Sequence, residues 1–170
     1  MQKTHTTTNF QKRKFPLVLV LDGVASPANV GSLFRLADAF HVEKLIFCGT
    51  SVDTQSNRLK RTARATVKNV IFEEHDSYEV VCMELKSSGY KIFALEIASE
   101  SKPLQDFKFS EVEKLALVLG NESTGIQDNV LKLADNLVHI NMFGENSSMN
   151  VTHAAAIALF EITKSLQPVR

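Results

Sequence analysis

Cysteine is scarce in this chain, and its placement argues against several classes of site. Cys48 and Cys82 are the only cysteines, they lie far apart, and neither belongs to a CxxC or a Cys/His cluster. The five histidines are scattered, without a pair at metal-ligand spacing. This pattern predicts two buried free thiols in a cytosolic protein rather than a disulfide or a metal site.

Net charge and long apolar runs are also lacking. Lys+Arg and Asp+Glu both number 19, so only the distribution of charge can point to a nucleic-acid partner. The longest apolar run, "AAAIALF", is far shorter than the roughly 20 residues that a membrane span needs. Residues 1–14 are polar and basic, with no apolar stretch behind the charged start. We therefore expect no secretory signal, a cytoplasmic protein, and a flexible basic tail before a single domain over residues 15–170.

The common nucleotide-binding loops are missing as well. No GxxxxGK[ST] occurs, and the glycines of "DGVASPANVG" after the first apolar run do not form GxGxxG. Neither a dinucleotide-binding fold of the common type nor a P-loop enzyme is indicated.

Short apolar runs that alternate with helix-like segments are abundant. Strands are expected at 17–21, 44–48, 70–72, 91–95, 115–119 and 137–140, and helices at 30–40, 56–66, 77–88, 126–134 and 150–166. The strand runs lack strict alternation, as strands buried on both faces do. They predict an α/β fold with a mostly parallel sheet covered by helices on both faces. Such sheets bind ligands beyond the carboxyl ends of their strands.

The first unusual stretch is "DGVASPANVGSLFRLADAF", residues 22–40. Asn29 is well placed to cap the helix that follows. Arg35 lies off the apolar face of that helix. It could pair with Asp38 on the surface, or its guanidinium could use the space left by Gly31 and Ser32 to receive a phosphate.

The second stretch is "LVLGNESTGI", residues 117–126, in which a buried strand ends at Gly120. One reading is a strand–turn–helix connection capped by Ser123 or Thr124. The other is that glycine at the strand end lets a ligand approach the backbone.

The third stretch is "HINMFGENSSMNVTHAAAIALFE", residues 139–161, where a polar loop precedes an alanine-rich helix. Ser148, Asn150 and Thr152 are all possible N-caps, which is more than one helix needs. The alanines are explained either by helix propensity or by a close approach of the backbone to another group.

The order of these stretches is more specific than any one of them. N-x-G-S-x-x-R, L-x-L-G-x-E-x-x-G and I-x-M-x-G-x-x-x-S-[LM]-N-V-[ST] together resemble the signature motifs of the SpoU family of RNA ribose 2′-O-methyltransferases, in the SPOUT superfamily. The resemblance runs from about residue 15 to 165, and "NESTGI" looks most like the TrmH-type tRNA enzymes. One departure is Asn141, where these proteins usually have proline.

The resemblance implies a homodimer with a C-terminal trefoil knot that binds S-adenosylmethionine and needs no metal. Carried over by motif, the cofactor-binding residues are Leu95, Glu96, Gly120, Ile140, Met142 and Met149. Main-chain groups of these segments are expected to read the adenine edge.

The resemblance also implies a catalytic set. It consists of Asn29, Arg35, Glu122, Ser148 and Asn150. Arg35 matches the arginine at the target 2′-hydroxyl, but a guanidinium keeps its proton up to a pKa above about 12. We therefore expect Arg35 to clamp an RNA phosphate and to orient the hydroxyl. Glu122 is expected to orient Asn29 or a loop amide rather than to act as a base.

A basic segment, "NRLKRTARATVK", is the candidate RNA-binding surface. Its cations are Arg58, Lys60, Arg61, Arg64 and Lys68, without an acidic residue between them. On one helix, all of these except Lys60 would share a stripe, which is either a solvated face or a set of phosphate contacts; we favour phosphate contacts. The tail cations Lys3, Lys12, Arg13 and Lys14 could add to it.

The function expected from these features is S-adenosylmethionine-dependent 2′-O-methylation of a ribose in structured RNA. A tRNA is favoured, with guanosine as the nucleotide, and rRNA is the alternative. A non-catalytic RNA- or adenosylmethionine-binding module on the same fold is the alternative of another class.

Overall fold

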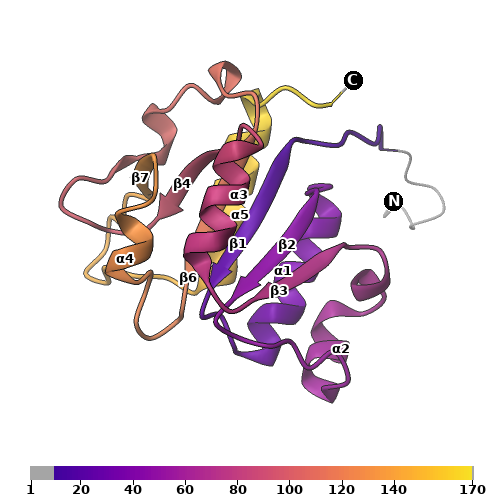
Figure 1. Cartoon of the computed structure of the whole chain (residues 1–170). Coiled ribbons are helices and arrows are strands. Elements are labelled where there is room, and N and C mark those ends of the chain that lie inside the picture. The colour runs from indigo at the N-terminus through magenta and orange to yellow at the C-terminus, as the bar shows by residue number, and fades with distance from the viewer. Residues whose placement is uncertain (1–9, 170) are drawn as a thin grey trace.

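A single seven-stranded sheet organises the chain, whose computed structural model describes residues 10–169 (Figure 1). The strands are β1 (Leu17–Asp22), β2 (Lys44–Cys48), β3 (Phe72–His75), β4 (Lys91–Leu95), β5 (Lys102–Pro103), β6 (Leu115–Gly120) and β7 (Asn136–His139). They lie in the order β3-β2-β1-β6-β4-β7-β5, and every pair of neighbouring strands is parallel. The predicted α/β class is confirmed, and the strand order is consistent with the knot that the resemblance implies.

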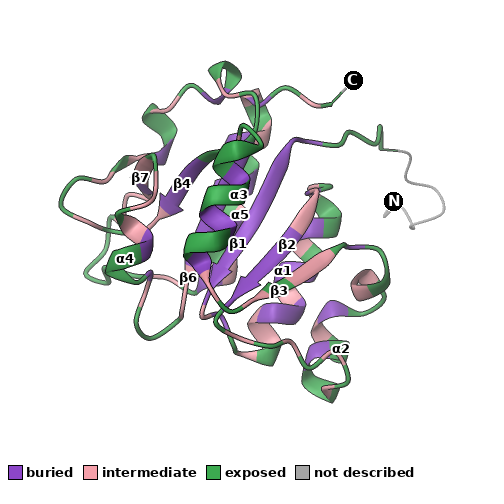
Figure 2. Cartoon of the chain, viewed as in Figure 1, coloured by how far each residue is buried: buried purple, intermediate pink, exposed green. Residues whose placement is uncertain are grey.

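Helices cover both faces of the sheet, as the lack of alternation predicted. The helices are α1 (Pro27–Ala39), α2 (Asn57–Ala63), α3 (Tyr78–Ser87), α4 (Asp128–Leu131) and α5 (Val151–Ser165), with 3-10 turns at Thr66–Lys68, Leu104–Asp106 and Phe109–Glu111. In β1, Leu19 packs in the cluster with α1 and α5, whereas Val20 packs in the cluster with α3 and α4. Figure 2 shows β1 buried along its whole length, between helices whose outer faces are exposed.

The region before α4 differs from the prediction. The helix expected at 126–134 is only Asp128–Leu131, and its N-cap, Gln127, makes no side-chain cap bond. The reason lies in contacts with residues from other parts of the chain. The Ile126 N–H donates to Glu96 Oε2 at 3.0 Å, and the Gln127 N–H donates to Asp22 Oδ2 at 3.0 Å. These carboxylates hold the backbone before the helix, so Ser123 and Thr124 do not cap it.

Two strands also differ from the prediction. The strand expected at 70–72 is Phe72–His75, which pairs with β2, and β5 had no signal in the sequence. Val70 is buried in the core instead of lying in a strand. An apolar run alone therefore did not distinguish a core residue in a connection from a strand residue.

Asn29 does not cap α1, contrary to the prediction. The helix begins at Pro27, whose fixed φ suits the first helical position, and the N-cap is Ser26. Asn29 is consequently the third residue of the helix, and its side chain is free for contacts with other segments.

Gly31 does not leave open space beside Arg35, which is a second correction in this helix. A Cβ at Gly31 would lie 2.0 Å from Thr62 Oγ1 and 2.8 Å from the Leu59 carbonyl oxygen. The glycine therefore allows α1 and α2 to pack closely, and the space it leaves is filled by α2.

Part of the predicted tail is attached to the domain. The Val169 N–H donates to the Lys14 carbonyl oxygen at 2.7 Å, and His41 Nδ1 lies 3.1 Å from the Arg13 carbonyl oxygen. Lys12 is exposed, and Lys3 lies outside the described residues.

The predicted free thiols are confirmed, because Cys48 and Cys82 are both buried and unpaired with each other. Burial, together with Asp22, raises the pKa of Cys48 to about 12. Between residues 10 and 169, no helix is long and apolar enough to cross a membrane.

Replacing Gly31 with alanine should destabilise the protein. Overpacking against α2 is expected to cost about 1–3 kcal/mol, and the better helix propensity of alanine offsets at most about 1 kcal/mol of it. Urea unfolding of Gly31→Ala measures the difference. Gly144→Ala is the matched control, since a Cβ there has no atom within 4 Å, and it should stay within about 0.5 kcal/mol of wild type. Equal stability of the two variants would contradict this account of the α1–α2 contact.

Candidate active site

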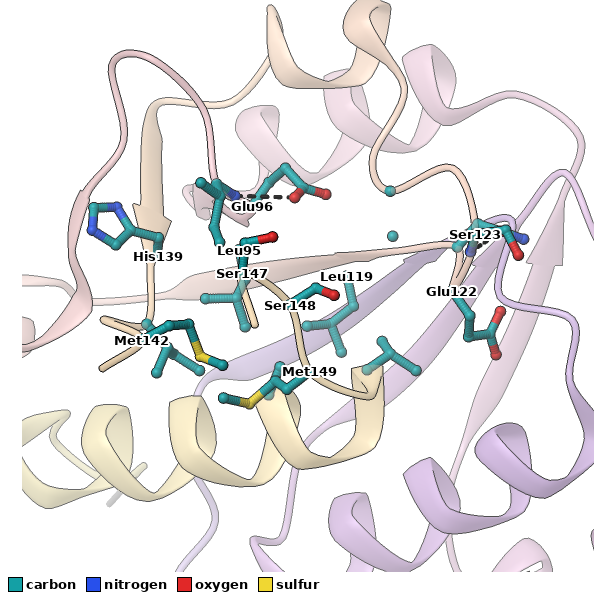
Figure 3. Close-up of a pocket in the computed structure, with 17 residues that line it drawn as sticks. Leu95, Glu96, Leu119, Glu122, Ser123, His139, Met142, Ser147, Ser148 and Met149 are labelled. Atoms are coloured by element: carbon teal, nitrogen blue, oxygen red, sulfur yellow. Dashed lines mark hydrogen bonds between the residues drawn. The ribbon is translucent and has the colours of Figure 1, made fainter. Parts of the chain in front are cut away.

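A cavity of about 270 Å³ lies at the carboxyl ends of β4, β6 and β7. These strands are neighbours in the parallel sheet, so the segments that leave them start at the same edge. All six residues predicted to bind the cofactor line this cavity: Leu95, Glu96, Gly120, Ile140, Met142 and Met149. Figure 3 shows His139 and Met142 toward one end of the cavity and Glu122 and Ser123 toward the other.

The Glu96 side chain is engaged by the backbone around the cavity. Its Oε2 accepts from the Ile126 N–H at 3.0 Å, and its Oε1 accepts from the Ile97 N–H at 3.0 Å. The Glu96 N–H donates to the Val138 carbonyl oxygen at 2.9 Å. Glu96 therefore links the end of β4 to β7 through its N–H and to the segment after β6 through its side chain, and both of its carboxylate oxygens already accept a hydrogen bond.

Gly120 lines the cavity, but the group that approaches its backbone is not the ligand that the sequence had suggested. A Cβ there would lie 2.3 Å from the carbonyl carbon of Gly125 and 2.4 Å from the backbone nitrogen of Ile126. The turn from Asn121 to Gly125, closed by two backbone hydrogen bonds between these residues, folds back over Gly120. The close approach is therefore made by the protein's own backbone.

Three residues of the predicted catalytic set form one hydrogen-bonded chain. Asn29 Nδ2 donates to Glu122 Oε1 at 2.6 Å, and Asn150 Nδ2 donates to Asn29 Oδ1 at 3.2 Å. The predicted contact between Glu122 and Asn29 is thus present. Residues separated by about a hundred positions in the sequence meet at the Glu122 end of the cavity.

Asn150 has a second role, as the N-cap of α5. Its Oδ1 accepts from the Thr152 N–H at 2.8 Å and from the Thr152 hydroxyl at 2.6 Å. Of the three possible caps in the sequence, Asn150 is the one used. Ser148 lines the cavity, is exposed, and makes no hydrogen bond with another described residue.

The N-termini of two helices meet at this hydrogen-bonded chain. Asn29 belongs to the first turn of α1, and Asn150 caps α5. Neither first turn contains an acidic residue, and Ser26 leaves the start of α1 without a side-chain cap. Helix N-termini present N–H donors and partial positive charge, so the Glu122 end of the cavity is suited to an anion such as a phosphate.

Within one chain, Arg35 lies apart from the hydrogen-bonded residues Asn29, Glu122 and Asn150. It lies six residues after Asn29, which on an ideal helix is about 9 Å along the axis and about 120° around it. Its side chain is exposed and forms no hydrogen bond or ion pair with residues 10–169, so the pair with Asp38 considered from the sequence is not formed.

The basic segment does not form the predicted stripe. α2 ends at Ala63, Arg64 has φ +55° outside the helix, and Lys68 lies in a 3-10 turn. The helix ends at Ala63 because Arg64 adopts φ +55° and ψ −128°, which turns the chain out of the helix, while Leu59 and Ala63 stay buried on the side that packs against α1. Arg58 and Arg61 stay together on α2. All five cations are exposed, and none has an acidic partner among the described residues.

Some cavity residues were missed by the sequence reasoning. Ile97, Leu119, His139, Ser147, Val151 and Ala154 line the cavity with parts of the turn from Asn121 to Gly125. Most are immediate neighbours of predicted residues, so extending each motif by one or two positions would have found them. His139 had its own signal, as a polar residue at the end of a strand. Among the described residues, no group of three or more His, Cys, Asp or Glu could hold a metal ion.

Comparison with known proteins gives one family. Residues 16–160 match the sequence model of the SpoU rRNA Methylase family. A curated relative is the 23S rRNA (guanosine(2553)-2′-O)-methyltransferase RlmP of Bacillus subtilis, which is 28% identical over 85% of this chain and 57% of its own length. The chain spans about half to two thirds of the length of the curated relatives it matches.

Two solved structures are informative. The SpoU methyltransferase AviRb of Streptomyces viridochromogenes, in complex with the cofactor AdoMet, is 25% identical with a TM-score of 0.78, over 91% of this chain and 61% of that one. A structure described as giving insight into 2-OH methylation of C/U34 on tRNA is 28% identical with a TM-score of 0.77, over 88% of this chain and 95% of that one.

Proposed function

Because the chain belongs to the SpoU rRNA Methylase family, we propose that it transfers a methyl group from S-adenosylmethionine to a ribose 2′-hydroxyl of RNA. The observation that carries the proposal is the meeting of Asn29, Glu122 and Asn150 at one end of a cavity at the strand ends. That arrangement supports the proposal, because polar groups that could hold a ribose hydroxyl and a phosphate would then lie beside the cofactor.

The cavity fits adenosylmethionine by its chemistry. Leu119, Ile140 and Met149 offer apolar contact, and the strand ends offer main-chain groups to an adenine edge. No lysine or arginine lines the cavity, so no cationic side chain opposes a positively charged ligand there. A bound sulfonium would supply the methyl group. The AdoMet complex of AviRb, with which the chain shares its fold, supports this assignment.

The polar groups suit an RNA strand at the Glu122 end. The N-termini of α1 and α5 would attract a backbone phosphate, and Asn29, held by Glu122, would orient the ribose. Ser148, with no partner among the described residues, would be a further donor to the ribose. Arg35 would clamp the phosphate and stabilise developing charge without giving up its own proton.

Transfer RNA is the favoured substrate. Support comes from the solved structure concerned with 2-OH methylation of C/U34 on tRNA, of which this chain covers 95%. The rRNA alternative rests on RlmP, whose name specifies a guanosine. Incubation with tritiated adenosylmethionine and bulk tRNA or bulk rRNA tests the proposal. Label in tRNA supports it, label in rRNA alone favours the alternative, and stoichiometric cofactor binding without transfer would indicate a non-catalytic module.

Arg35→Ala should abolish methyl transfer while leaving adenosylmethionine binding near that of wild type. The physical reason is that Arg35 is exposed on α1 and does not line the cavity. Tritium transfer measures the first effect and calorimetric titration the second. A folded Arg35→Ala protein that has lost cofactor affinity would refute this division of roles.

We propose that the protein forms a homodimer, in which Arg35 of one subunit reaches the hydrogen-bonded chain of Asn29, Glu122 and Asn150 in the other. The motivation is that one chain leaves Arg35 outside that network. A face of α5 also exposes apolar side chains, with Ile157 44% and Phe160 62% exposed. Light scattering at micromolar concentration should therefore show a dimer.

Complementation tests the shared site. Arg35→Ala and Glu122→Ala should each be inactive. Mixing them under conditions that exchange subunits should restore part of the activity, because one site of each heterodimer then has both side chains. A fully active monomer, or no recovery in confirmed heterodimers, would rule out the arrangement.

The cations on α2 are proposed to contact RNA phosphates. Arg58→Glu with Arg61→Glu should raise the Michaelis constant for RNA with little change in turnover at saturating RNA or in cofactor affinity. Each lost phosphate contact should reduce the slope of log affinity against log salt by about 0.7–0.9. Filter binding at several salt concentrations measures this.

The matched control for this double variant is Lys108→Glu with Lys132→Glu. It makes the same charge change at two exposed lysines, of which Lys132 directly follows α4, a helix on the opposite side of the molecule from α2 (Figure 1). If both double variants weaken RNA binding equally, the effect is one of net charge and α2 is not a specific contact surface.

A further inference from the structure

The loop between β7 and α5 is almost free of hydrogen bonds. Across residues 141–149, the structure describes one such bond, in which His139 Nε2 and Asn141 Oδ1 lie 3.1 Å apart. The next fixed point is Asn150, the cap of α5. Residues 143–148 are all exposed. The conformation of this cavity wall therefore depends on packing and on a single polar contact at its start.

The other nitrogen of the same ring reaches a different wall. His139 Nδ1 lies 2.9 Å from Ser101 Oγ. Ser101 in turn closes the loop after β4, because its N–H donates to the Ala98 carbonyl oxygen at 3.0 Å and its Oγ accepts from the Ala98 N–H at 3.1 Å. The imidazole thus connects the loop at 98–101 to the loop that begins at Asn141.

Proton placement on the ring is compatible with both contacts. In the tautomer with its proton on Nε2, His139 donates to Asn141 Oδ1 and accepts from the Ser101 hydroxyl, whose one proton then points to Nδ1 rather than to the Ala98 carbonyl oxygen 2.7 Å away. Both nitrogens are then engaged within the protein. His139 lines the main cavity and also a neighbouring one of about 280 Å³, so the ring stands between them with no nitrogen left for a ligand.

We propose that His139 is a positioning residue for the cofactor. The imidazole of His139 joins Ser101 to Asn141 and so holds the loop at 141–149 in the conformation that binds the cofactor. This inference rests on the proposed function for the identity of the ligand. A side-chain hydrogen bond restrains Asn141 here, and a proline at this position would instead fix φ covalently.

A proline at position 141 can be tested as a replacement for the hydrogen bond between His139 and Asn141. The Asn141 N–H donates to no other group within residues 10–169, so proline at this position removes no hydrogen bond of the described protein. Asn141→Pro alone should therefore bind adenosylmethionine about as well as wild type. The same substitution should compensate for loss of the histidine.

The experiment measures adenosylmethionine affinity by calorimetry, without RNA, for the full chain. His139→Ala should weaken binding on the order of tenfold, as expected for loss of a bridging hydrogen-bond partner. It should raise the Michaelis constant for the cofactor with little change in turnover at saturating cofactor. His139→Ala combined with Asn141→Pro should recover most of the affinity. Unchanged affinity in His139→Ala, or no recovery in the double variant, overturns the proposal.

His75→Ala is the matched control, since His75 also ends a strand of the sheet but does not line the cavity; its affinity should equal that of wild type. If His139→Ala does not fold, Ser101→Ala and Asn141→Ala replace it, because each removes one end of the link. Weaker binding in both supports the proposal, and wild-type affinity in both overturns it.

Hydrogen exchange in the cofactor-free protein separates this inference from the proposed function. His139→Ala should speed exchange of the Ala98 and Ser101 amides, whose hydrogen bonds close the loop that the ring contacts; the amides of residues 141–149 have no hydrogen bond within the described residues to lose. This result does not depend on methyl transfer. Unchanged exchange overturns the link, whereas faster exchange with no transfer activity in wild type counts only against the proposed function.

Discussion

The site depends on one constraint, which is that β6, β4 and β7 are parallel neighbours and therefore end at the same edge of the sheet. The chain leaves each strand with backbone groups that can no longer pair within the sheet. The turns and loops that follow diverge, and the cavity is the space between them. An antiparallel arrangement would have sent alternate loops to opposite edges and left no common site.

Polar side chains hold the diverging loops together. Glu96 links the end of β4 to the segment after β6, Asn29 links Glu122 to Asn150, and His139 links the loop after β4 to the one after β7. Each link joins segments that are distant in the sequence. Directional hydrogen bonds suit this task, because walls that must face a ligand cannot all be buried in apolar packing against one another.

Small residues show where interpretation from sequence reaches its limit. Gly31 and Gly120 were both read as leaving room for a ligand, and both instead allow a close contact within the protein, with α2 and with the turn after Asn121. A glycine in a sequence indicates that something approaches the backbone. Identifying the approaching group requires the tertiary structure, because that group comes from another part of the chain.

The sequence by itself determined the α/β class, the parallel sheet and the free thiols, and its resemblance to the SpoU family indicated the three segments that line the cavity. These follow from local patterns, since runs of Val, Leu and Ile specify buried strands and the motifs lie at strand ends. Only the tertiary structure decided that Asn29 also accepts from Asn150, that α2 ends before Arg64, that Arg35 stands apart from the network, and that His139 spans two loops. These features depend on contacts between residues far apart in sequence, and helical periodicity or cap preference describes only neighbours along the chain.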